Sequence, residues 1–142
     1  MRHQTKKNTL SKAQDQRDAL LRSLATELFT HDEIKTTMSR AKALRPYAEG
    51  LITLAKKGDL NSRRQAAKFI YDKELEKFIN PETGEIFDEK SEDKKIVPVT
   101  VLRKLFSVIG KKYAQRNGGY TRIYRLPARR GDATDMALIQ LV

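Results

Sequence analysis

The chain of 142 residues carries 29 lysine and arginine residues against 18 aspartate and glutamate residues, which gives a formal net charge of +11. It has no cysteine and no apolar run near the ~20 residues of a membrane span, which excludes disulfide frameworks, thiolate metal sites and a transmembrane helix. This length predicts one domain with a core of its own. The charge predicts a polyanionic partner, foremost a nucleic acid, with a solvated basic surface or a membrane-surface protein as the alternative.

The first fourteen residues are predicted to form a basic arm, because they contain hardly any apolar side chain that could anchor them to a core. Such an arm can order along an RNA backbone, and a frayed terminus is the alternative. Its basic residues, all candidate RNA contacts, are Arg2, His3, Lys6, Lys7 and Lys12. No apolar stretch follows them, so a secretory signal is not expected.

A helix is predicted to begin at Asp15, with Arg17 and Arg22 outside its apolar stripe as further candidate RNA contacts. That stripe consists of Leu20, Leu21, Leu24, Ala25, Leu28 and Phe29. His31 falls in the turn that follows, and a lone histidine is more often structural than a metal ligand.

Residues 33–37 alternate charged and uncharged side chains, which predicts a half-buried strand carrying the candidate contact Lys35. Thr37 can cap a long amphipathic helix that Gly58 ends in a left-handed conformation. Pro46 lies inside this helix and predicts a kink or a break into two helices. The basic residues beside the apolar stripe, all candidate RNA contacts, are Arg40, Lys42 and Arg45.

Asp59 can cap a third helix whose outward Arg63 and Arg64 suit a phosphate clamp, with a solvated helix face as the alternative. Its inward residues are expected to be Leu60, Ala66, Ala67, Ile70 and Tyr71, and the helical pattern can be continued through Leu75 and Phe78.

Residues 80–95 hold six acids and three bases, a net charge of −3, and are expected to form a mobile acidic insertion loop. Phosphate would repel this segment, so it should point away from RNA, toward solvent or a neighbouring protein. Ile86 and Phe87 are the candidate anchors to such a partner.

Pro98 suits the first turn of a fourth helix, with an apolar stripe of Val101, Leu102, Leu105, Phe106, Ile109 and Tyr113. Gly118 and Gly119 break this helix, and residues 120–126 and 136–142 are predicted strands joined by a basic turn. The order helix, strand, three helices, two strands predicts an α/β fold of the α+β type. We expect a two-layer sandwich with a small mixed three-stranded sheet.

No feature of the sequence predicts an enzyme or a cofactor site. The two histidines are far apart, and neither a glycine-rich phosphate loop nor a nucleophile elbow is present. Asp132 and Asp135 could form the metal-binding pair of a nuclease, although turn-forming acids are the simpler explanation.

Cations instead concentrate near the C-terminus, where arginine suits phosphate: Lys111, Lys112, Arg116, Arg122, Arg125, Arg129 and Arg130. Tyr120 and Tyr124 share one side of the predicted strand with Arg122 between them. They could stack unpaired bases, and packing within the domain is the alternative.

Several segments together resemble the family of the bacterial large-subunit ribosomal protein numbered seventeen. In the N-terminal half they are Met1-Arg2-His3, Gln16 to Leu24, Ile34-Lys35-Thr36-Thr37, Arg40-Ala41-Lys42, Leu51 to Lys56 and Arg63-Arg64-Gln65-Ala66. In the C-terminal half they are Gly118 to Ile123, Arg129-Arg130-Gly131-Asp132, Met136-Ala137 and Leu141-Val142. Arg64-Gln65-Ala66 and Ile70-Tyr71-Asp72-Lys73 also resemble the cyanobacterial and plastid branch. Gln4, Thr5 and the acidic insertion depart from the family pattern.

The resemblance implies a structural constituent of the large ribosomal subunit that binds and bridges 23S-type rRNA near the nascent-chain tunnel exit. It implies neighbouring large-subunit proteins as partners, no catalysis, no membrane and no small-molecule substrate. The expected location is the cytoplasmic ribosome of a bacterium or the ribosome of a plastid. A free RNA-binding regulator and a metal-dependent RNA-processing nuclease are the alternative functions.

Overall fold

A computed structural model describes residues 8–88 and 96–142 of the chain. The predicted RNA contacts Arg2, His3, Lys6 and Lys7, and part of the predicted acidic loop, therefore lie outside the described residues.

The first three elements follow the predicted order. They are α1 (Gln14–His31), β1 (Glu33–Thr37) and α2 (Met38–Lys57), and Gly58 ends α2 in the left-handed region with φ of 71°. Of the two alternatives expected at Pro46, the break into two helices is wrong, because α2 is continuous through it. Proline removes one backbone donor, but the stripe on both sides of it is buried, and this packing holds the helix together. Thr37 occupies the N-cap position without a side-chain hydrogen bond, and the Met38 N–H instead donates to the Asp135 carbonyl at 2.9 Å.

The third helix is shorter than the pattern suggests. Helix α3 (Leu60–Ala67) is capped by Asp59, whose carboxylate accepts from the Ser62 N–H at 3.3 Å. Ala66 and Ile70 are buried as predicted, whereas Leu60 is 63% exposed and Tyr71 46% exposed. Ala67 is exposed as well. These three inward assignments were wrong: within α3 only Ser62 and Ala66 are buried, and Tyr71 follows the end of the helix.

A second, small sheet stands where a helix and a loop were expected. It consists of β2 (Glu74–Ile79), β3 (Ile86–Phe87) and β4 (Val97–Thr100) in the antiparallel order β3-β2-β4. Leu75 and Phe78 therefore belong to a strand, and part of the predicted loop is ordered as β3. Pro98 lies in the edge strand β4 rather than in a helix, and an edge strand is where a sheet tolerates proline.

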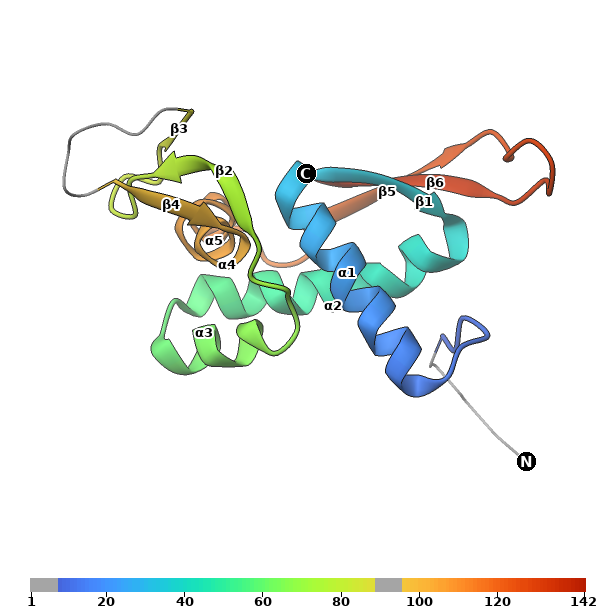
Figure 1. Cartoon of the computed structure of the whole chain (residues 1–142), viewed down its shortest axis with the longest axis horizontal. Helices are drawn as coiled ribbons and strands as arrows, with labels where there is room; N and C mark the ends of the chain where they lie inside the picture. Colours follow the sequence, from blue (N-terminus) through green and yellow to red (C-terminus); the bar gives the residue numbers. More distant parts are fainter. Residues whose placement is uncertain (1–7, 89–95) are drawn as a thin grey trace.

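The predicted fourth helix begins at Val101, after the Thr100 hydroxyl caps it by accepting from the Arg103 N–H at 3.3 Å. It runs as α4 (Val101–Lys104), a π-helical segment η1 (Leu105–Ile109) and α5 (Gly110–Lys112). Its predicted stripe is buried except for the half-buried Leu102. Figure 1 shows the second sheet lying against this helical rod.

The main sheet has the order β1-β6-β5, with β5 (Thr121–Leu126) and β6 (Met136–Leu141) forming the C-terminal hairpin. All its pairs are antiparallel, so the predicted mixed sheet was wrong while the α+β class is confirmed. The register aligns Ile34, Ile139 and Ile123 in one row that faces the core. Helices α1 and α2 cover this face, and the opposite face is left open (Figure 1).

Candidate nucleic-acid interface

The open face of the main sheet presents a tyrosine between basic side chains. Strand alternation puts Lys35, Leu138 and Tyr124 in one cross-strand row on this face, and Glu33, Gln140 and Arg122 in the next row, with the acid at the β1 edge and the arginine at the β5 edge. Lys35 and Arg122 are exposed, and Tyr124 is 43% exposed. A nucleotide lying on this face could stack its base on Tyr124 while its phosphates meet the flanking cations.

At the β5 edge of this sheet lies a hollow of about 360 Å³ lined by Arg45 of α2, Arg116 after α5 and Arg122 of β5. We call it the arginine hollow; the rest of its lining is Gly119, Thr121, Ile123 and Val142. No aspartate or glutamate is part of this lining. Three guanidinium groups from distant parts of the chain thus meet around one concave surface.

Two of these arginines have no partner within the described part of the protein. Within the described residues, the side chains of Arg116 and Arg122 make no hydrogen bond or ion pair. Arg45 is shared, since its Nε lies 3.6 Å from a Glu49 carboxylate oxygen that also accepts from the Thr121 hydroxyl at 3.0 Å. The hollow therefore keeps a net positive charge and has free donors for an anion.

A lysine positions the rim of the hollow. Lys56 Nζ donates to the Arg116 carbonyl at 2.6 Å and to the Tyr120 hydroxyl at 3.2 Å, and that hydroxyl donates to the same carbonyl at 3.1 Å. The hydrogen bond from Lys56 lowers the pKa of the Tyr120 hydroxyl. The sequence analysis missed this role of Lys56, because its partners follow about sixty residues later and no local pattern announces them.

The prediction that Tyr120 stacks RNA bases is wrong. Tyr120 is only 4% exposed, and its ring packs against Tyr113 with 5.2 Å between the ring centroids. Its backbone still continues the ladder, because the Val142 N–H donates to the Tyr120 carbonyl at 3.1 Å, but Tyr113 and Lys56 pack against its side chain. Tyr124 keeps the predicted accessibility.

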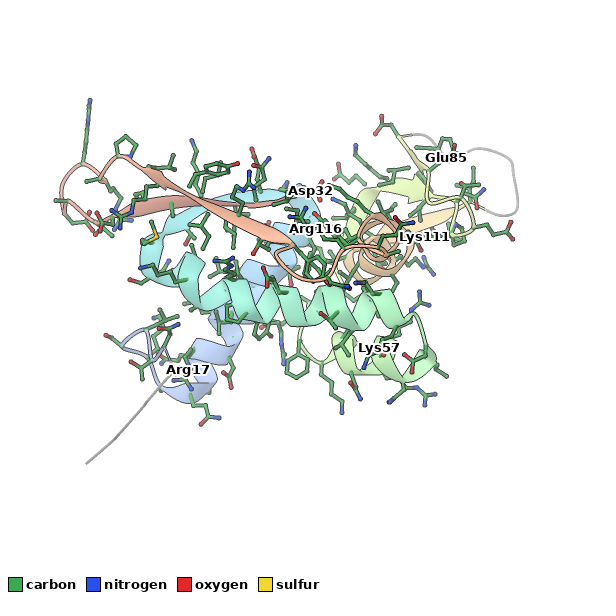
Figure 2. The ribbon with its side chains drawn as sticks, turned by 180° about the vertical axis from the view of Figure 1, so that it is seen from behind. Arg17, Asp32, Lys57, Glu85, Lys111 and Arg116 are labelled. Atoms are coloured by element: carbon green, nitrogen blue, oxygen red, sulfur yellow. The ribbon has the colours of Figure 1, made fainter. Side chains whose placement is uncertain are left out.

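Several other predicted cations are engaged within the protein. Lys111 Nζ donates to the Glu82 carbonyl at 2.8 Å. Lys112 Nζ lies 5.3 Å from the centre of the Tyr113 ring, and the Arg63 guanidinium lies 5.3 Å from the centre of the Phe106 ring. Figure 2 shows Lys111 on the side of the molecule that carries the acidic residue Glu85, so Lys111 is a poor candidate for a phosphate contact.

The tip of the C-terminal hairpin holds a paired arginine and a free one. Arg129 donates to both oxygens of Asp132, at 3.1 and 2.6 Å, and the Thr134 hydroxyl donates to the same carboxylate at 2.6 Å. The hydrogen bond from Arg129 is the main reason why the pKa of Asp132 is strongly lowered. Arg125 and Arg130 are exposed and have no partner among the described residues.

This geometry argues against the nuclease alternative. The Asp132 carboxylate is already saturated by donors, and the described part of the chain contains no cluster of three potential metal ligands. Asp132 and Asp135 both have structural roles in the turn. The Asp132 carboxylate accepts from the Thr134 N–H, and the Asp135 carbonyl accepts from the Met38 N–H at the start of α2.

Helix α1 offers fewer accessible cations for RNA contacts than predicted. Arg17 is only 7% exposed, so the expected phosphate contact by this side chain is contradicted. Arg22 is half-buried, with its guanidinium 5.3 Å from the centre of the Tyr71 ring. Figure 2 shows Arg17 well apart from both Lys57 and Arg116, so the labelled cations do not form one patch. The predicted contacts that are simply exposed elsewhere are Lys12, Arg40, Lys42 and Arg64.

None of the helices in the described ranges is long and apolar enough to cross a membrane. The family model "Ribosomal protein L17" matches residues 20–142. Similar proteins named large ribosomal subunit protein bL17 come from Streptococcus sanguinis, Streptococcus pneumoniae and Streptococcus gordonii. Each is 47% identical over 133 residues, which cover 94% of this chain and 96% of the relative. The chain therefore belongs to the ribosomal protein L17 family.

Proposed function

We propose that the chain is a structural constituent of the large ribosomal subunit that binds large-subunit rRNA through the arginine hollow and the open face of the main sheet. Family membership carries the first half of this proposal. The second half, which names the RNA-binding surface, rests on the geometry of the arginine hollow and the main sheet. Its role is positional, since a bound protein that neutralises phosphates from separate rRNA segments holds those segments together.

The observation that carries the RNA surface is the convergence of Arg45, Arg116 and Arg122 on one hollow. A guanidinium group presents a planar fork of donors that matches two phosphate oxygens, and such charge-assisted bonds are stronger than neutral ones. Because Arg116 and Arg122 have no partner within the described chain, binding a phosphate breaks no bond inside the protein. Tyr124 lies on the same strand as Arg122 and offers an unpaired base a ring to stack on.

The proposal includes a place in the cytoplasmic ribosome of a bacterium, near the tunnel exit, beside other large-subunit proteins. The streptococcal relatives support the bacterial part. The tunnel-exit position rests on the family resemblance alone. The exposed cations Lys35, Arg40, Lys42, Arg125 and Arg130 are proposed as further rRNA contacts around the central surface.

The test measures binding of the purified protein to large-subunit rRNA fragments as a function of salt concentration. Arg116→Ala combined with Arg122→Ala should lower the affinity and flatten its dependence on salt. Two lost phosphate contacts correspond to a decrease of about 1.4 to 1.8 in the slope of log affinity against log salt.

The matched control is Lys73→Ala combined with Lys77→Ala. It removes the same charge, but Lys73 is paired with Glu27 at 3.8 Å and Lys77 with Asp88 at 3.1 Å. This control should leave the slope unchanged. Equal slopes for the two double variants would show that net charge, and not the arginine hollow, sets the affinity.

A further inference from the structure

The second sheet reverses the charge of the protein. Residues 74–88 contain five acids and one base, a net charge of −4, while the whole chain carries +11. The remaining residues therefore sum to +15. A surface of this sign is repelled by rRNA phosphates, so in the particle it must face solvent or another protein.

This acidic surface is held in place. The turn after β2 approaches η1 so closely that a Cβ on Gly84 would lie 3.0 Å from the Ser107 carbonyl oxygen. Lys111 Nζ holds the same turn through the Glu82 carbonyl at 2.8 Å, and Lys77 pairs with Asp88 at 3.1 Å. A backbone held in this way loses little conformational entropy on binding, so it presents the acidic residues better than a mobile segment would.

A groove of about 730 Å³ runs between this sheet and the corner where α1 meets β1. We call it the acidic groove. Val99, Val108, Ile109 and Leu141 give it apolar surface, residues 30–32 line it on the α1 side, and residues 73–77 of the β2 region line the other. The elements that border it, β2 and the C-terminal end of α1, can be located in Figure 1. Ile86, which is 38% exposed, stands at its edge.

Four lysines and four carboxylates line the acidic groove, so its charge toward a partner depends on which of them are paired. Of its lysines, Lys73 and Lys77 are paired with acids, and Lys104 pairs with Asp32 at 3.0 Å. Lys112 lies over the Tyr113 ring and keeps its positive charge, and His31 lies 3.2 Å from Glu27. Glu74 and Glu76, in contrast, are exposed and have no partner among the described residues.

We propose that the acidic groove receives an extended, lysine-rich segment of a neighbouring protein of the large subunit. Lysine has a long apolar stem and a charged head, so the stems can lie on the apolar surface while the ammonium groups meet Glu74 and Glu76. The adjoining exposed Ile86 and Phe87 add apolar surface for such a segment. An RNA strand would bring like charge to Glu74 and Glu76, so these carboxylates favour a cationic segment over RNA as the occupant. The proposal rests on the place in the large subunit proposed above.

The experiment uses purified large subunits that contain the chain. A carbodiimide joins carboxylates to amines in direct contact, and mass spectrometry identifies the joined peptides. The expected result is a bond from Glu74 or Glu76 to a lysine of another ribosomal protein. It should disappear in Glu74→Gln combined with Glu76→Gln, and persist in the control Asp15→Asn combined with Asp18→Asn.

A second measurement labels carboxylates with carbodiimide and glycine ethyl ester. Glu74 and Glu76 should be labelled in the free protein and protected in the particle. Equal labelling in both states would overturn the proposal, and so would protection without any bond to a protein lysine. Absence of the chain from large subunits in a sucrose gradient would refute the proposed function. If the chain is present but Glu74 and Glu76 stay accessible, only the proposed binding of a lysine-rich segment in the acidic groove is refuted.

Discussion

Two helical glycines provide a paired test of the packing between α2 and the C-terminal helical rod. A Cβ on Gly110, at the start of α5, would lie 2.9 Å from the Ala55 carbonyl oxygen and 3.3 Å from the Ala55 Cβ in α2. A Cβ on Gly50, within α2, would meet nothing within 4 Å. Alanine is favoured over glycine in a helix by about 1 kcal/mol, and this gain is common to both sites. Only Gly110→Ala adds the cost of overpacking against backbone, typically about 1–3 kcal/mol.

Gly50→Ala should therefore stabilise the protein by about 1 kcal/mol, and Gly110→Ala should be less stable than Gly50→Ala by about 1–3 kcal/mol. Urea unfolding followed by circular dichroism measures both free energies of unfolding, with the wild type as reference. If Gly110→Ala were as stable as Gly50→Ala, the close crossing of the two helices at Ala55 would be refuted.

Three further predictions concern the core and the hairpin tip. Leu51 is 3% exposed within the core, so Leu51→Ala should lower the free energy of unfolding by about 2–5 kcal/mol; a loss of a few tenths in the same urea assay would place it outside the core. The pKa of Asp132 is lowered by Arg129, so its contribution to stability is present above the unfolded pKa of about 3.9 and is lost as the pH falls toward the folded pKa. Wild-type stability should thus fall more steeply below about pH 4 than that of Asp132→Asn, and parallel curves would contradict the pairing. Arg130→Ala should reduce the salt slope of rRNA binding by about 0.7 to 0.9, whereas Arg129→Ala should reduce it less because its fork is occupied by Asp132; the reverse order would show that the pair opens on RNA.

The periodic elements of the fold could be predicted from the sequence. Helices α1 and α2 and strands β1, β5 and β6 follow local signals, such as the left-handed Gly58 and the alternation from Tyr120 to Leu126. The second sheet could not be predicted, because β2 pairs with β4 about twenty residues later and the charged segment between them gives no pairing signal. Pro98 was misplaced for the same reason: it suits either a helix start or an edge strand, and the partner strand decides between them.

The charge of the interface could be predicted, but its geometry could not. Arg45, Arg116 and Arg122 were each expected to bind RNA, yet only the folded chain brings them to one hollow. Burial removed Tyr120 and Arg17 from the candidates, because exposure depends on neighbours remote in sequence. The Arg129 guanidinium is paired with Asp132, three residues away, and this pairing depends on the conformation of the turn.

The most direct test of RNA binding through the arginine hollow is a high-resolution cryo-electron microscopy map of large subunits that contain this chain. The guanidinium groups of Arg116 and Arg122 should lie within hydrogen-bond distance of rRNA phosphate oxygens, with the open face of the main sheet against RNA. A map in which the chain is bound but the arginine hollow faces solvent or another protein would contradict the proposed interface.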